Sequence, residues 1–131
     1  MIVDTSALIA ILRDERDAIV YAGAIAEAAI GRISAATHVE TAAVIDTSRD
    51  PIASRRFDDL LREARFAIEP VTEAQGHIAR EAFRDFGRGS GHPARLNFGD
   101  CFAYALARAM NEPLLFTGDD FTRTDITSAL A

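Results

Sequence analysis

Four acidic residues lie at the edges of apolar segments and far apart in the sequence: Asp4, Glu40, Asp100 and Asp119. Asp4 directly follows the apolar run at residues 1–3, and Asp119 comes shortly after another apolar run at residues 114–116. Where several strand ends and helix starts bring carboxylates to one point, that point can bind a divalent cation and act on a phosphodiester. The pattern therefore predicts a metal-dependent nuclease.

Helix and strand signals alternate along the chain. Apolar residues at helical spacing, with capping residues before them and glycine or proline after them, predict helices at about residues 7–12, 15–29, 37–48, 51–66, 74–86 and 99–110. Short apolar runs predict strands at residues 1–4, 33–35, 68–71 and 114–117. Thr5 or Ser6 is expected to cap the first helix, and the glycine-rich segment 87–93 is expected to be a loop.

This alternation predicts an α/β fold. Strands separated by helices imply right-handed crossovers and a parallel sheet that is covered on both faces. A chain of 131 residues can bury one substantial core, so we expect a single domain over residues 1–131. Ligands bind such sheets at the carboxyl ends of the strands, which is where Asp4 and Asp119 fall.

Composition narrows the class of protein. The net charge of −6 argues against nucleic-acid binding, but metal-binding carboxylates would be neutralised by a cation, and all 14 basic residues are arginine, which suits phosphate contacts. Cys101 is the only cysteine, so an internal disulfide is impossible. Charged residues interrupt every apolar run, and we expect a soluble cytoplasmic protein with no membrane association.

Each acid also has a purely structural interpretation. Thr37 with Glu40 has the spacing of a helix capping box, and Asn97 with Asp100 resembles one. Asp4 and Asp119 could be turn residues that follow strands. Taken singly these motifs decide little. Their common position, just after a strand or in the first turn of a helix, is what favours a shared site.

At these residues the sequence resembles the PIN-domain ribonucleases and, within them, the VapC toxins of prokaryotic toxin–antitoxin pairs. Four segments carry the resemblance: residues 3–8, the helix of Glu40, residues 91–101 and residues 115–121. The resemblance implies a PIN-like three-layer α/β/α fold with a parallel sheet. It also implies a Mg²⁺-dependent or Mn²⁺-dependent endoribonuclease, a homodimer and a VapB-like antitoxin as partner.

Carried over by position, the four acids match the family's acidic quartet. The resemblance implies that Asp4, Asp100 and Asp119 hold the metal directly or through water. Glu40 would bind a second ion or orient the attacking water. The products would carry 5′-phosphate and 3′-hydroxyl ends.

Other residues near the quartet are less specific. Ser6 and Thr117 match hydroxyl positions that could orient Asp4 and Asp119, and Asn97 could be a site residue or only a cap. Asp120 is expected to cap the segment that begins at Phe121 rather than to contact the metal. Arg88 and Arg95 flank the glycine-rich loop and are the candidates for RNA phosphate contacts. The histidines lack metal-ligand spacing, and none is expected to be the base.

Two alternatives stand beside the nuclease. A catalytically inert PIN-fold module could use the fold only to bind a partner, although the complete quartet argues against it. A phosphatase of the haloacid dehalogenase type also begins with an aspartate after a strand. However, Ser6 replaces the second aspartate which that family needs, and the chain contains no lysine. For the nuclease, looped or single-stranded RNA is the expected substrate, with transfer or ribosomal RNA loops as the family's usual targets.

Overall fold

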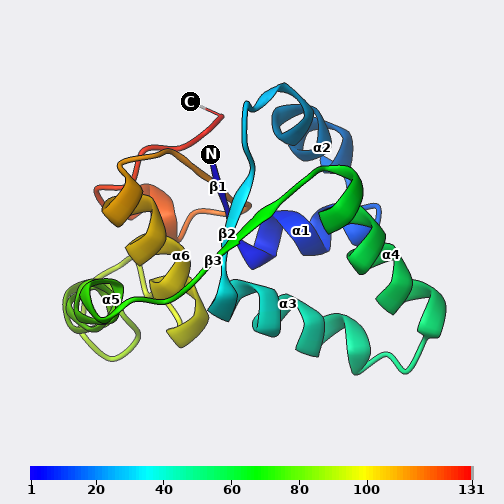
Figure 1. Cartoon of the computed structure of the whole chain (residues 1–131). Coiled ribbons are helices and arrows are strands. Elements are labelled where there is room, and N and C mark those ends of the chain that lie inside the picture. Colours follow the sequence, from blue (N-terminus) through cyan, green and yellow to red (C-terminus); the bar gives the residue numbers. More distant parts are fainter. Residues whose placement is uncertain (131) are drawn as a thin grey trace.

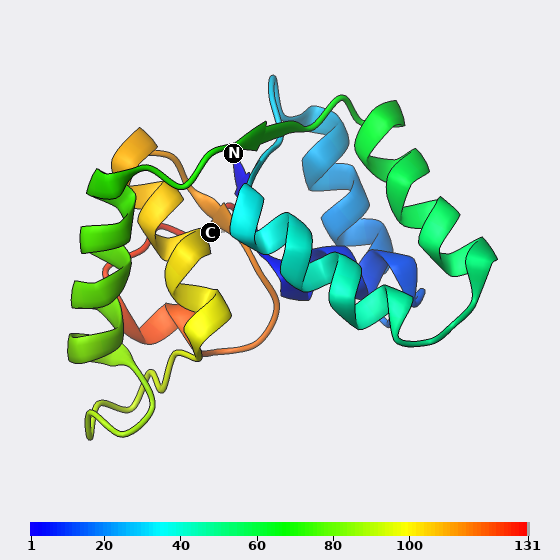
Figure 2. The ribbon, with the colours of Figure 1, turned by 60° about the horizontal axis from the view of Figure 1, so that its bottom comes forward.

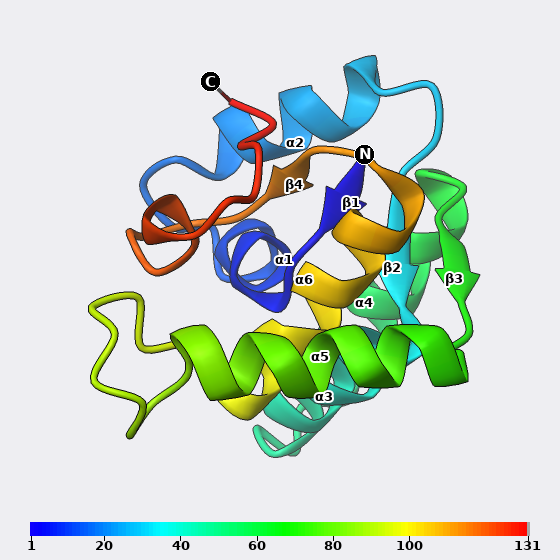
Figure 3. The same ribbon diagram turned by 90° about the vertical axis from the view of Figure 1, so that its left-hand side faces the viewer.

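Four short parallel strands form the centre of the computed structural model, which describes residues 1–130. The strands are β1 (Ile2–Val3), β2 (Arg32–Ser34), β3 (Ala67–Glu69) and β4 (Leu114–Leu115), and their order in the sheet is β3-β2-β1-β4 (Figure 3). Ile2 pairs with Arg32 on one side and Leu114 on the other. The central strands carry fully buried apolar side chains, as expected of a parallel sheet that is covered on both faces.

Helices cover the two faces of this sheet (Figure 1). Their bounds are α1 (Thr5–Leu12), α2 (Ala18–Glu27), α3 (Ala35–Asp46), α4 (Pro51–Glu63), α5 (Glu73–Phe86) and α6 (Phe98–Met110), and a short 3₁₀ helix follows at Phe121–Arg123. Ile2 packs in a cluster with residues of α5 and α6, whereas Val3 packs with residues of α1, α2 and α4. Successive strand residues point to opposite faces, so the two clusters are the two sides of a three-layer α/β/α arrangement.

Capping residues determine where several helices begin. Thr72 and Asp50 cap α5 and α4 with their side chains, and Pro51 occupies the first turn of α4 as predicted. The expected cap of α1 was wrong: Asp4, not Thr5 or Ser6, is the capping residue, because its carboxylate accepts a hydrogen bond from the Ser6 N–H.

The capping box predicted for Thr37 and Glu40 was also wrong. Helix α3 begins at Ala35 and is capped by Ser34, since β2 leads directly into the helix without a loop. Glu40 therefore lies beyond the first turn, where no free backbone N–H needs a cap.

Several element bounds differ from the sequence-based expectation. Helix α2 starts at Ala18 rather than near residue 15, because residues 13–14 and 16–17 form turns and Asp14 adopts a positive φ of 51°. Strands β1, β3 and β4 are two or three residues long, shorter than their predicted runs, and β2 is displaced by one residue from its predicted position. The loop predicted at residues 87–93 is present, and Gly89 and Gly91 adopt φ values of +85° and +87° there. None of the helices in residues 1–130 has the length and apolar character needed to cross a membrane.

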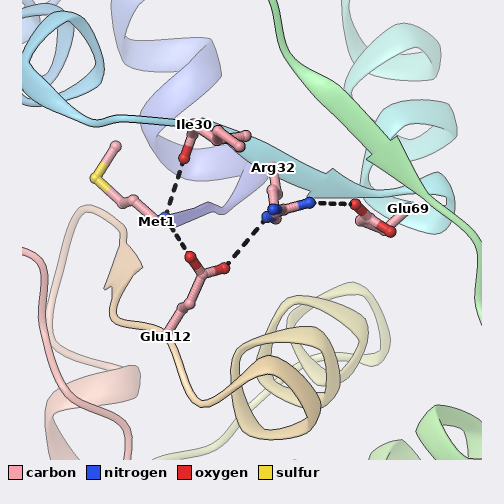
Figure 4. A network of polar contacts seen from close by, with 5 residues as sticks. All are labelled: Met1, Ile30, Arg32, Glu69 and Glu112. Atoms are coloured by element: carbon pink, nitrogen blue, oxygen red, sulfur yellow. Dashed lines mark hydrogen bonds and ion pairs between the residues drawn. The ribbon is translucent and has the colours of Figure 1, made fainter.

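A polar network ties the amino terminus to neighbouring strands of the sheet (Figure 4). Arg32 pairs with Glu69 at 2.6 Å and with Glu112 at 3.5 Å, and Glu112 also pairs with the amino group of Met1 at 3.1 Å. These contacts link β1, β2, β3 and the segment before β4. Met1, Arg32 and Glu112 lie at or before the starts of their strands, whereas Glu69 is the last residue of β3.

Candidate active site

Asp4 is the most buried of the candidate acids, with a relative exposure of 3%. Strand β1 ends at Val3, and the Asp4 side chain turns back to cap α1. Its Oδ2 atom accepts hydrogen bonds from the Ser6 N–H at 3.0 Å and the Ser6 hydroxyl at 2.6 Å. No donor among residues 1–130 reaches the buried Oδ1 atom. Buried polar oxygens are rarely left without a partner, so Oδ1 is a vacant acceptor suited to a cation or a water.

Glu40 reaches the same region from α3. Its Oε1 atom accepts a hydrogen bond from the Thr5 hydroxyl at 2.6 Å. The Thr41 hydroxyl lies 3.1 Å from the Thr5 Oγ1 and 2.9 Å from the Thr37 carbonyl oxygen, so its one proton is shared between two acceptors. The side chain of Glu40 is thus joined to the first residue of α1, next to Asp4.

Asp100 lies in the first turn of α6 and forms a reciprocal capping box with Asn97. The Asn97 N–H donates to Asp100 Oδ2 at 2.9 Å, and the Asp100 N–H donates to Asn97 Oδ1 at 2.8 Å. The predicted capping box is therefore confirmed. It fixes the Asp100 carboxylate through one oxygen. The structural role does not exclude a chemical one, because a carboxylate has acceptor sites on both oxygens.

The charges of these acids interact. Burial raises the pKa of Asp4 from 3.8 to about 6; hydrogen bonds from Ser6 oppose this rise, and the negative charge of Glu40 adds to it. Burial likewise raises the pKa of Asp100 from 3.8 to about 7, with further increases from Asp4, Asp120 and Glu40. Carboxylates repel one another in this way only when they lie close together. A divalent cation would relieve the repulsion and compete with protons for the site.

The loop after β4, orange in Figure 2, passes near the start of α6, and the charge of Asp120 on this loop acts on Asp100. The Thr117 N–H donates to the Ser6 hydroxyl at 3.0 Å, which joins this loop to the group that holds Asp4. Both Asp119 and Asp120 are exposed. Asp120 contributes to the raised pKa of Asp100, whereas Asp119 is not among the groups that shift Asp4 or Asp100. The prediction that Asp120 caps the following segment was wrong: Asp120 directly precedes the 3₁₀ helix, but its side chain makes no capping hydrogen bond.

The cluster fits a hydrated cation better than a fully protein-ligated one. Within residues 1–130, no three Asp, Glu, His or Cys side chains are arranged to ligate a single ion together. Magnesium commonly takes one or two carboxylates and keeps several waters. The oxygen-only donor set, the vacant Asp4 Oδ1 and the closeness of Asp100 suit such an ion.

The two predicted RNA-contact arginines lie on the loop that leads into α6. Arg88 and Arg95 are both exposed, and neither forms an ion pair with a residue in the part of the chain that the structure describes. Arg95 adopts a positive φ of 53°, immediately before Leu96 and the Asn97 cap. Both guanidinium groups are therefore available to an anionic ligand.

The structure also shows three residues around Glu40 that sequence reasoning did not single out for the site. These are Thr5, Thr41 and Gly99. Thr5 stood in the Asp4-Thr5-Ser6 run but was interpreted only as a cap, and Thr41 and Gly99 carry no signal in a linear pattern. Their relation to Glu40 depends on the approach of α1, α3 and α6.

Comparison with known proteins identifies the family. The model of the PIN domain matches residues 1–126. The chain belongs to the PIN-domain family. It is 59% identical over 130 residues to the ribonuclease VapC28 of Mycobacterium tuberculosis and to a VapC ribonuclease of Mycobacterium bovis, with 99% of this chain and 98% of each relative covered. It is 49% identical over 129 residues to the ribonuclease VapC42 of M. tuberculosis, which covers 98% of both chains.

A solved structure supports the same fold. The crystal structure of VapC20 from M. tuberculosis, a sarcin–ricin loop cleaving toxin, superposes with a TM-score of 0.76 over 96% of this chain and 95% of that one, at 17% identity. The predicted PIN-like three-layer α/β/α fold is therefore confirmed. So is the prediction of a PIN-domain ribonuclease of the VapC toxin family. This membership leaves the phosphatase alternative without support.

Proposed function

We propose that the chain acts as one PIN-like endoribonuclease domain whose catalytic residues are Asp4, Glu40, Asp100 and Asp119. The observation that carries the proposal is the meeting of Asp4, Glu40 and Asp100 from three separate elements, with one buried Asp4 oxygen left free. A structural site alone would not require repelling carboxylates to be held together. The pKa values of Asp4 and Asp100 are raised by burial and by charged neighbours, which is common where a site is built for chemistry.

The cofactor that suits this site is Mg²⁺, with Mn²⁺ as an alternative. Asp4 and Asp100 would hold the ion, Asp119 would reach it through water, and Glu40 would orient the attacking water or contact a second ion. When bound, such an ion polarises the scissile phosphate and lowers the pKa of a coordinated water.

The surrounding residues keep the carboxylates in place. Ser6 donates two hydrogen bonds to Asp4 Oδ2, which leaves Oδ1 for the ligand. Asn97 fixes Asp100 through the capping box, and Thr117 holds the loop of Asp119 against Ser6. Partners that orient ligands in this way typically matter by roughly 10- to 100-fold in affinity or activity.

The substrate class is RNA, with a looped or single-stranded segment of transfer or ribosomal RNA as the target. The structural neighbour VapC20 is a sarcin–ricin loop cleaving toxin, which is the kind of target that the fold can accommodate. Arg88 and Arg95 would contact phosphates beside the site, since each is exposed and without an acidic partner among the described residues. Sequence would be read from unpaired bases.

Regulation would come from a VapB-like antitoxin, and the active form would be a homodimer. The repelling carboxylates form a negative site that a basic antitoxin segment would complement. Association of toxin and antitoxin should therefore weaken as salt concentration rises.

The test is RNA-end sequencing of a purified RNA pool after incubation with the protein and Mg²⁺. We expect discrete cuts that disappear with EDTA and with Asp4→Asn, and that persist with Asp58→Asn, a matched change at an exposed residue of α4. Folded, antitoxin-free protein that makes no cuts in any RNA would instead support the inert binding module.

A further inference from the structure

The carboxylate of Glu40, a residue of α3, lies between α1 and α6. On one side, the Thr5 hydroxyl of α1 donates to Oε1 at 2.6 Å. The Thr41 hydroxyl, one residue after Glu40, lies 3.1 Å from the Thr5 Oγ1 and 2.9 Å from the Thr37 carbonyl oxygen. Because Thr5 donates its proton to Glu40, its oxygen can accept one from Thr41. The two hydroxyls thus form a short hydrogen-bond chain that ends at the Glu40 carboxylate.

On the other side, the carboxylate lies against the backbone of α6 at Gly99. A Cβ atom added at Gly99 would be 1.8 Å from Glu40 Oε2 and 2.4 Å from Glu40 Cδ. No real Cβ atom approaches another heavy atom so closely, so the carboxylate would have to withdraw by more than an ångström. The Glu40 carboxylate therefore occupies the space that a side chain would take at residue 99.

Backbone conformation does not explain the glycine. Gly99 lies in the regular first turn of α6, and it is not among the glycines with positive φ. In a helix, alanine is preferred to glycine because it loses less conformational freedom on folding. The contact with Glu40 is the structural reason for glycine at this position.

We propose that Thr5, Thr41 and Gly99 are positioning residues that fix the Glu40 carboxylate beside Asp4 and Asp100. The hydrogen-bond chain of the two threonines orients Glu40 Oε1, and the absence of a side chain at Gly99 leaves space for Glu40 Oε2. This inference rests on the proposed function, since it concerns how the same acidic site is assembled. The first turn of α6 would then contribute two features to the site. Asp100 would be a ligand, and the space beside Gly99 would hold the Glu40 carboxylate of α3.

Two substitutions test the two sides separately. Gly99→Ala inserts the methyl group that displaces the carboxylate, and Thr5→Val removes the donor. Thr5→Ser keeps the hydroxyl and serves as the rescue variant. Gly23→Ala is the matched control, because Gly23 also lies in a helix, α2, and an added Cβ there would meet nothing within 4 Å. Each variant is made in the wild-type background and again with Glu40→Ala.

Two quantities are measured on the full-length protein, the dissociation constant for Mn²⁺ alone and the kcat of RNA cleavage. Thermal unfolding in EDTA controls for folding. For Gly99→Ala and Thr5→Val we expect Mn²⁺ binding several-fold weaker and kcat lower by roughly 10- to 100-fold. Tm should stay at or above the wild-type value for Gly99→Ala, while Thr5→Ser and Gly23→Ala should resemble wild type.

The Glu40→Ala background is decisive. If Gly99 acts through Glu40, Gly99→Ala causes no further loss once the carboxylate is gone, since the methyl group no longer meets it. A loss of the same size in both backgrounds, or wild-type Mn²⁺ affinity and kcat for Gly99→Ala, overturns the proposal. Failure of the proposed function would look different: the wild-type protein itself would bind Mn²⁺ no better than Asp4→Asn.

Discussion

Removing the charge of Asp4 should stabilise the metal-free protein while it abolishes activity. In the folded state, burial raises the pKa of this carboxyl from 3.8 to about 6. The folded protein therefore binds a proton more tightly than the unfolded chain does, and the free energy of unfolding falls as pH rises from about 4 to about 6. Each unit of pKa corresponds to about 1.4 kcal/mol, so ionised Asp4 costs about 3 kcal/mol above pH 6.

Asp4→Asn removes this cost without removing the helix cap. Asparagine caps helices about as well as aspartate, so its Oδ1 atom can replace the Oδ2 that accepts from Ser6. Its amide group would occupy the place of the unpartnered Oδ1, beside the negative charge of Glu40. Imperfect hydrogen bonding of that amide offsets part of the gain. We expect a net stabilisation of about 1–3 kcal/mol at pH 8.

The assay is urea denaturation of wild type, Asp4→Asn and the surface control Asp58→Asn in EDTA at pH 4, 6 and 8. The advantage of Asp4→Asn should be near zero at pH 4 and largest at pH 8, and saturating Mg²⁺ should stabilise wild type but not the variant. A variant that is less stable than wild type at pH 8 in EDTA, or a difference that does not vary with pH, would refute this reasoning.

Three further predictions concern the same site. Mn²⁺ affinity and the cleavage rate should both rise with pH between about 5 and 8 as Asp4 and Asp100 lose protons, which metal titration and a pH–rate profile would show; a flat profile would contradict the raised pKa values. Asp120→Asn should move the rising limb of that profile to lower pH, because Asp120 contributes to the raised pKa of Asp100, whereas Asp119→Asn should reduce the rate itself; equal effects in both variants would contradict this difference. Asn97→Ala should lower the free energy of unfolding by about 0.5–2 kcal/mol through loss of the cap, and it should also slow cleavage. A variant that loses stability but cleaves at the wild-type rate would show that the cap does not support the site.

The sequence predicted that the site lies at the carboxyl edge of the sheet. It did not predict the contacts between residues within the site. Asp4 follows a buried strand, and a parallel sheet places such a residue at the edge where ligands bind. That argument needs only the order of the elements. The approach of Glu40 to Thr5 and Gly99 instead depends on how α1, α3 and α6 pack, and no periodic pattern encodes it.

The errors at helix starts have a common physical cause. Sequence reasoning placed the caps of α1 and α3 one to three residues too late, at Thr5 or Ser6 and at Thr37. In the structure β1 and β2 run almost directly into these helices, and the residue at the junction becomes the cap: Asp4 for α1 and Ser34 for α3. After β3 and β4, by contrast, residues 70–72 and 116–120 connect the strand to the next helix.

Under the proposed function, Asp4 and Asp100 would each serve both as a helix-capping acid and as an acid of the site. Each carboxylate uses one oxygen, Oδ2, to accept a backbone hydrogen bond at a helix start, from Ser6 in the first turn of α1 and from Asn97, the capping residue of α6. The cap fixes the side chain at low conformational cost, and the second oxygen belongs to a group whose orientation is already determined. A residue that only capped a helix would not need burial beside other acids, and an acid held by no cap would lose rotamer freedom on binding a ligand. Two roles in one residue would also explain why short sequence motifs could not separate them, since the same spacing would serve the helix and the proposed site.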